Sequence, residues 1–145
     1  MLRLGDVPNP SRRAAKQDTM KSPVQIKRVY EAPSDTDGLR VFIDRLWPRG
    51  VSKDTFQYDL WCKDLAPSPA LRTWFGHKPE HWQGFRRDYA AELRDEQAQA
   101  RMGEVFAAAR GRRITLVFGA KDPEHNHALI LAEAMNDYAL RHAIA

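Results

Sequence analysis

The chain has a single cysteine and no long hydrophobic run, and each shortage excludes a class of protein. Cys62 alone cannot form a disulfide within the chain, which excludes a disulfide-stapled secreted fold. The longest apolar stretches, such as 128–132, have about five residues, whereas a membrane helix needs roughly 20. No charged and then apolar signal segment opens the chain. We therefore expect a soluble protein of the reducing cytoplasm with no membrane partner.

Several catalytic and nucleotide-binding motifs are also absent. The chain contains no Gly-x-Gly-x-x-Gly, Walker, Gly-x-Ser-x-Gly or Cys-x-x-x-x-x-Arg sequence. The common dinucleotide-binding, nucleoside-triphosphatase, serine-hydrolase and tyrosine-phosphatase classes therefore lose support. The zinc-binding patterns Cys-x-x-Cys and His-Glu-x-x-His are missing as well. The sequence indicates no particular cofactor.

The net charge of +4 is concentrated near the start of the chain. Residues 1–22 hold five basic and two acidic side chains, which leaves 18 basic and 17 acidic ones for the rest of the chain. Because residues 1–22 also lack an apolar period, we expect a disordered basic tail, or a start codon at Met20 that leaves most of it untranslated. A body charge of +1 gives little support for an extended nucleic-acid footprint.

The remaining residues, 23–145, have the hydrophobic pattern of one α/β domain. We expect a central mixed sheet of few strands packed by about four to five helices. The valine- and isoleucine-rich segments predict strands at 24–30, 39–43 and 114–118. Only eight residues separate the first two strands, which should be antiparallel or non-adjacent. Apolar spacing and capping residues predict helices that begin near Pro69, near Pro79, in the segment before Gly111, and near Pro123 or Asn126.

The helices of residues 53–110 should form a crossover between the second strand and the third, which makes these two strands parallel. The segments that leave them, 45–50 and 119–127, then emerge at the same edge of the sheet. Ligands of open α/β sheets normally bind at this carboxyl edge.

The first exit segment suits a planar anion. It contains Asp44, Arg45, Trp47 and Arg49. The arginine fork donates paired hydrogen bonds to phosphate or carboxylate, and the indole can stack on a base. The alternative is an ion pair of Asp44 and Arg45 at a strand end, with Trp47 as a lid on the core.

The second exit segment places Lys121, Asn126 and His127 ahead of a helix N-terminus, which favours anions. Simple helix capping by Asn126 or Asp122 is the alternative, although capping alone does not require a lysine. If the two segments meet, their four basic groups surround one cleft and need an anionic ligand to offset their repulsion.

The chain resembles the YeaO-like branch of the bacterial domain-of-unknown-function family 488 (DUF488) over most of residues 24–140. The matching segments are Ile26 to Tyr30, Asp44 to Gly50, Trp61 with Lys63, Ala66 to Ser68 with Leu71 and Arg72, Phe85 with Tyr89, Glu92 and Leu93, Ala120 to Asp122, and Asn126 to Ala128. The resemblance implies a small cytoplasmic α/β protein and no settled activity.

Glu92 belongs to this shared pattern and borders the apolar stripe of its helix. A half-buried carboxylate there needs a partner, which Arg72 or Lys63 could supply. A structural salt bridge is one interpretation, and a general acid or base with a raised pKa is the other.

Histidine spacing gives a metal-binding alternative. His77 and His81 are four residues apart, and His125 and His127 are two apart. Pro79 separates the first pair, so these two need not share a helix face. Cys62 is interpreted as packing in preference to a reactive thiol.

Our leading hypothesis is an enzyme that binds a small phosphorylated or nucleotide-like anion. The candidate catalytic residues are Asp44, Glu92 and His127, and the candidate anion-binding residues are Arg45, Trp47, Arg49, Lys63, Arg72, Lys121 and Asn126. A non-catalytic nucleic-acid-binding or regulatory module, with tryptophans as stacking surfaces, and a histidine metal site are the alternatives.

Overall fold

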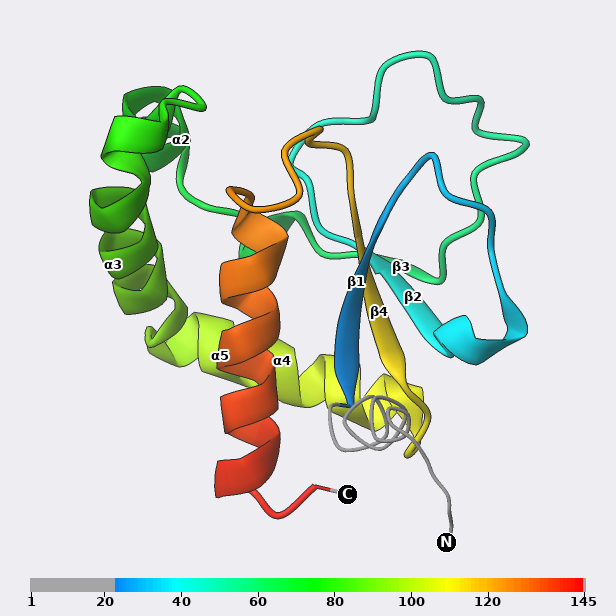
Figure 1. Ribbon diagram of the computed structural model, residues 1–145. Helices are drawn as coiled ribbons and strands as arrows, with labels where there is room; N and C mark the ends of the chain where they lie inside the picture. The colour runs from blue at the N-terminus through cyan, green and yellow to red at the C-terminus, as the bar shows by residue number, and fades with distance from the viewer. Residues whose placement is uncertain (1–22, 145) are drawn as a thin grey trace, which may run out of the picture.

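The computed structural model describes residues 23–144, and the predicted basic tail lies outside the described residues. A four-stranded sheet with helices against one face confirms the α/β class (Figure 1). The strands follow the order β1-β4-β2-β3, and their bounds are β1 Val24–Arg28, β2 Leu39–Phe42, β3 Leu60–Trp61 and β4 Ile114–Phe118.

All pairings among these strands are parallel, where the sequence predicted a mixed sheet. The strands β1 and β2 are non-adjacent, because β4 lies between them and pairs with both. The ten-residue link 29–38 spans up to about 33 Å when extended, which is long enough to return from the end of β1 to the start of β2. The predicted parallel pairing of β2 with β4 is confirmed.

Four α-helices occur in the described residues, and the first residues of α2 and α5 agree with the capping signals. The helix expected near Pro79, α3, begins at Trp82 without a side-chain cap, because Pro79–His81 form a separate short turn. Ser68 accepts a hydrogen bond from the Leu71 amide at the start of α2, and Gly76 ends this helix with a φ of 52°. Asn126 caps α5 in the same way through the Leu129 amide. The bounds are α2 Pro69–Phe75, α3 Trp82–Leu93, α4 Glu96–Ala109 and α5 His127–Arg141. None of the helices in residues 23–144 has the length and apolar character needed to cross a membrane.

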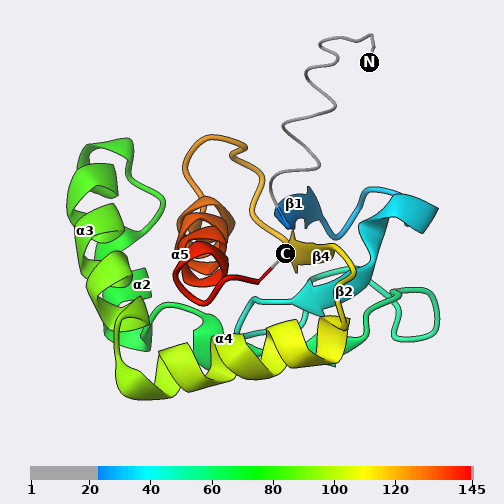
Figure 2. The ribbon, with the colours of Figure 1, turned by 90° about the horizontal axis from the view of Figure 1, so that it is seen from below.

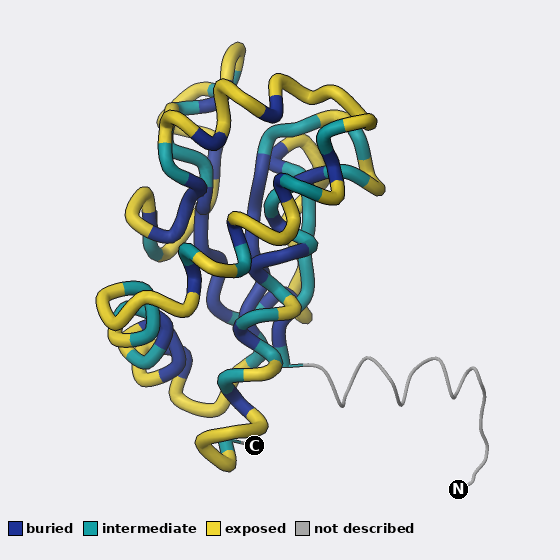
Figure 3. Tube along the Cα trace, turned by 90° about the vertical axis from the view of Figure 1, so that its left-hand side faces the viewer, coloured by how far each residue is buried: buried dark blue, intermediate teal, exposed yellow. Residues whose placement is uncertain are grey.

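The main core lies between the sheet and the helices. Val41 and Ile43 of the β2 segment and Leu116 of β4 face the helices and are fully buried. The predicted stripe of α3 is confirmed, since its four large apolar side chains are buried: Trp82, Phe85, Tyr89 and Leu93. Figure 2 shows α5 between α3 and the strands β1 and β4, and Figure 3 shows how buried and exposed segments alternate along the chain.

The other face of the sheet is covered by the loop between β2 and β3 instead of by helices. Phe42 alternates with Val41 and faces this side, where Phe56 packs edge to face on it at 5.3 Å between ring centroids. Trp47 and Trp61 complete the cluster. The same loop therefore closes the sheet and begins with the residues of the first exit segment.

Candidate functional site

A pocket of about 500 Å³ lies at the carboxyl edge of the sheet, as the strand directions predict. The loops that follow β1, β2 and β4 line one part of it, and α2 with the segment after it lines the other. The two exit segments, 45–50 and 119–127, do meet here. The volume lies within the range of ordinary small-molecule sites.

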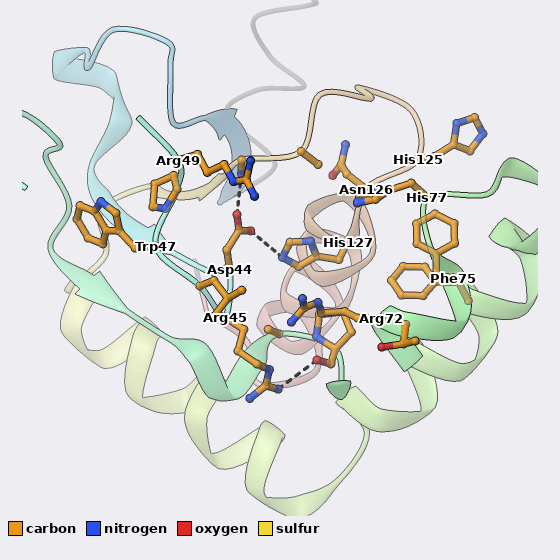
Figure 4. A pocket seen from close by; sticks show the side chains of 18 of the residues that line it. Asp44, Arg45, Trp47, Arg49, Arg72, Phe75, His77, His125, Asn126 and His127 are labelled. Carbon is orange, nitrogen blue, oxygen red and sulfur yellow. Dashed lines mark hydrogen bonds and ion pairs between the residues drawn. The ribbon is translucent and has the colours of Figure 1, made fainter. Parts of the chain in front are cut away.

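Asp44 and His127 form a pair at the centre of the pocket (Figure 4). Asp44 Oδ2 accepts a hydrogen bond of 2.9 Å from the Gly119 amide. Its Oδ1 lies 3.3 Å from His127 Nε2, which also lies 3.3 Å from the Ile43 carbonyl. Because a carbonyl can only accept, this geometry assigns the proton of a neutral His127 to Nε2. Asp44 thus joins the ends of β2 and β4 to the first turn of α5.

Burial controls the ionisation of this pair. Burial raises the pKa of Asp44, and the attraction of His127, the Gly119 amide and Arg72 offset only part of that rise. Burial also lowers the pKa of His127, although Asp44 and the Ile43 carbonyl oppose the change. A neutral imidazole at pH 7 follows. The Gly119 amide binds Asp44 Oδ2, whereas the buried Oδ1 faces His127 Nε2 and has no hydrogen-bond partner within residues 23–144. Asp44 thus has the position of a residue that orients Gly119 and His127.

Three arginines line the pocket. Arg45 and Arg49 belong to the loop after β2, and Arg72 belongs to α2. Arg45 donates to the Pro67 carbonyl at 3.1 Å, and its buried Nε has no hydrogen-bond partner within residues 23–144. The side chains of Arg49 and Arg72 lie on either side of the Asp44–His127 pair (Figure 4). Both are exposed, and neither guanidinium makes a hydrogen bond to the described part of the chain. Asp44 is the only carboxylate among the described lining residues.

Two of the other predicted binding residues border the pocket but are engaged by the protein. Trp47 donates its indole N–H to the Val51 carbonyl at 2.8 Å and packs on Phe42 and Phe56. Asn126 caps α5 and donates to the Asp122 carbonyl at 2.8 Å. Both therefore hold the two exit loops in place.

The remaining predicted site residues do not line the pocket: Glu92, Lys63 and Lys121. Glu92 accepts hydrogen bonds from the Ser68 amide at 2.9 Å and the Ser68 hydroxyl at 2.6 Å, and so supports the start of α2. The Lys63 ammonium lies 4.3 Å from the ring centre of Trp61. Lys121 is exposed on the loop after β4. The structure therefore joins the arginines of the first exit segment with His127 but not with Lys121.

No cluster of three or more His, Cys, Asp or Glu side chains that could hold a metal ion occurs within residues 23–144. His125 borders the pocket and lies 2.9 Å from Asp122. His81 stacks on Trp74 instead, at 4.1 Å between ring centroids, so it does not join His77 in one site. Burial raises the pKa of the Cys62 thiol to about 11, which agrees with its interpretation as packing.

The lining residues that the sequence reasoning did not assign to an anion site include Tyr30, Phe75 and His77. Phe75 has the spacing of a core residue, and it does stack on Phe85 at 4.3 Å. His77 has a φ of 58°, a left-handed conformation that is rare for a residue with a side chain. Tyr30 stands two residues after β1. Because β1 also ends at the carboxyl edge of the sheet, its exit segment could have been searched for site residues in the same way as the other two.

Comparison with known proteins finds relatives whose length this chain covers almost completely. A family model described as "Inactive DUF488-N3 subclade" matches residues 23–143. The uncharacterised protein Rv3073c of Mycobacterium tuberculosis is 40% identical over 114 residues, which are 78% of this chain and 93% of that protein. The uncharacterised protein YeaO of Escherichia coli is 40% identical over 111 residues, 76% of this chain and 94% of that protein. No solved structure matches the chain.

Proposed function

The chain belongs to the inactive DUF488-N3 subclade, and from this premise we propose that it binds a small phosphorylated or nucleotide-like anion at the carboxyl edge of its sheet. The subclade's description favours binding without turnover over the enzyme that the sequence suggested. The lone buried thiol of Cys62 is compatible with the reducing cytoplasm as the place of this binding.

The observation that carries the proposal is the charge of the pocket. Arg45, Arg49 and Arg72 border it with one carboxylate, Asp44, whose oxygens face the Gly119 amide and His127. The guanidinium groups of Arg49 and Arg72 retain their hydrogen-bonding capacity within the described chain. Guanidinium donors match phosphate and carboxylate oxygens in pairs, and a partly enclosed site strengthens such bonds.

Binding of ribose phosphate and adenosine monophosphate, measured by calorimetry and by the shift of the thermal midpoint, tests the proposal. We expect Arg49→Gln and Arg72→Gln each to weaken binding by about tenfold to a hundredfold, because each removes a charged hydrogen-bond donor. Both side chains are exposed, so the midpoint without ligand should hardly change.

Arg86→Gln is the matched control, since Arg86 is a surface residue of α3 that pairs with Glu133 and does not line the pocket. Its affinity for both phosphates should equal that of the unaltered protein. The proposal would be overturned if neither phosphate bound at millimolar concentration, or if all three variants lost affinity equally.

Catalysis is the second candidate, and the Asp44–His127 pair is the observation that favours it. A neutral imidazole oriented by a carboxylate can accept a proton from a bound hydroxyl or water. Mass spectrometry of adenosine monophosphate after long incubation with the protein distinguishes the two functions. We expect the nucleotide to be recovered intact; conversion that is lost in His127→Gln would replace binding with catalysis.

A further inference from the structure

Tyr30 stands out at the pocket because its large ring is 52% exposed. It lies just beyond β1, at the carboxyl end of the sheet, and borders the same pocket as Arg49. Its hydroxyl donates to the Arg49 carbonyl at 3.2 Å. The ring is therefore held at a fixed position on the rim, although half of its surface remains open.

One face of the Tyr30 ring is already covered by protein. The guanidinium carbon of Arg28 lies 4.7 Å from the ring centre. Arg28 is itself fixed, because its Nε donates to the Ala120 carbonyl at 2.9 Å and its Nη2 to the Gly119 carbonyl at 3.3 Å. The exposed surface of Tyr30 consequently consists of the opposite face and the ring edge.

A cation on one face of an aromatic ring draws electron density toward itself. The opposite face of Tyr30 is left open to flat groups. A heterocyclic base is such a group, and base stacking on tyrosine stabilises binding without selecting one base. Arg28 thus acts as a positioning residue that holds the Tyr30 ring in place.

We propose that Tyr30 stacks on the flat ring of the ligand whose anionic group is bound by Arg49 and Arg72. This inference rests on the proposed function and narrows its ligand class to a phosphate ester that carries an aromatic ring, as a nucleoside monophosphate does. The pocket of about 500 Å³ is large enough for a ligand of this size.

The test compares adenosine monophosphate with ribose phosphate, which has the same phosphate and sugar but no base. Calorimetry should give about tenfold tighter binding of adenosine monophosphate, the usual effect of one base stacked on an aromatic side chain. Tyr30→Ala should remove this difference and leave the affinity for ribose phosphate nearly unchanged. Tyr30→Phe keeps the ring and should retain the difference.

Tyr58→Ala is the control. Tyr58 is an exposed tyrosine as well, at 39%, but it packs on Phe56 and Trp47 and does not line the pocket. It should leave the ratio of the two affinities unchanged. Equal binding of the two phosphates to the unaltered protein would overturn the stacking role and leave anion binding intact. An equal loss of both in Tyr30→Ala would also overturn it, because Tyr30 would then act only by holding Arg49. Failure of both phosphates to bind would remove the proposed function as well as this inference.

Discussion

The role of each charged residue near the pocket depends on which of its hydrogen-bonding atoms the neighbouring residues leave without a partner. Asp44 is the clearest case, because a sequence reader sees only an acid that follows a strand. In the structure its two oxygens meet the Gly119 amide and His127. A Cβ atom on Gly119 would lie 3.0 Å from Asp44 Oδ2, so a side chain at that position would press on this contact. Asp44 and Gly119 together fix the spacing between the β2 and β4 exits.

The stability of the protein should depend on pH through His127. Its folded pKa lies below the ordinary value of 6.5 because of burial. Just below pH 6.5 the unfolded chain therefore binds a proton that the folded chain does not, and stability falls as the pH is lowered through this window. Urea unfolding between pH 8 and about 5.5 should give a smaller fall for His127→Gln.

The raised pKa of Asp44 acts in the opposite direction at lower pH. Between its ordinary value of 3.8 and its higher folded pKa, the folded state binds the extra proton, so stability recovers in part as the pH falls. Asp44→Asn should lack this recovery. Identical pH profiles for the unaltered protein and His127→Gln would contradict a buried, neutral imidazole.

At the scale of elements, the short helix α2 carries Arg72 into the pocket and is held at its first turn. Glu92 of α3 accepts two hydrogen bonds from Ser68, and the Ser68 hydroxyl caps the Leu71 amide. A helix of seven residues has little stability of its own, so this connection fixes where α2 begins.

Glu92→Ala should therefore destabilise the protein by about 1 to 2 kcal/mol, the usual cost of a lost cap with its charged hydrogen bonds. Because Glu92 does not line the pocket, we expect little change in phosphate affinity at a temperature where the variant is folded. Ser68→Ala and the double variant complete a cycle whose coupling energy measures the contact. A large loss of affinity with an unchanged thermal midpoint would instead support a catalytic or binding role for Glu92.

The elements that sequence could predict are those with a strong local signal. The α3 stripe has regular spacing, and α2 has a capping serine, a proline and a final glycine. The two-residue strand β3 has no period to detect, because its position depends on pairing with Val41 and Phe42. The sequence left open whether β1 is antiparallel or non-adjacent to β2, and the structure confirms the second alternative, because β4 lies between them.

The residues of the candidate site also fall into those that the sequence could predict and those that it could not. Chain order predicted that Arg45, Arg49 and His127 share an edge, and they do line one pocket. Lys121 has the same sequence logic but is exposed outside the pocket, because the direction of a loop side chain is set by packing that a sequence does not encode locally. Tyr30 shows the converse, since an ordinary aromatic residue becomes notable only beside Arg28 and the Arg49 carbonyl.

At the scale of the whole molecule, the sheet separates two groups of charges. The pocket occupies the carboxyl ends of the strands, whereas Asp37 lies just before β2, near their amino ends. Asp37 is 2% exposed and pairs with Lys27 at 2.9 Å and Arg40 at 2.6 Å. Burial tends to raise the pKa of Asp37, but the bonds from Lys27, Ser34 and Arg40 outweigh it and the pKa is lowered.

The two ends should contribute independently, and Asp37→Asn tests this. The variant leaves the buried Arg40 guanidinium without its anion, so we expect a loss of about 3 kcal/mol or more in unfolding free energy. Asp37 stabilises the fold above pH 3.8, and its contribution is lost as the pH falls through its lowered folded pKa, so the variant should be less sensitive to acid in that range. Asp35→Asn, an exposed neighbour, controls for charge and should change the unfolding free energy little.

The effects of substitutions at distant sites on the unfolding free energy usually add. We therefore expect unchanged phosphate affinity in folded Asp37→Asn, and additive losses of stability when it is combined with Glu92→Ala. A fall in affinity in Asp37→Asn, absent in Asp35→Asn, would instead show that the strands transmit changes between their two ends.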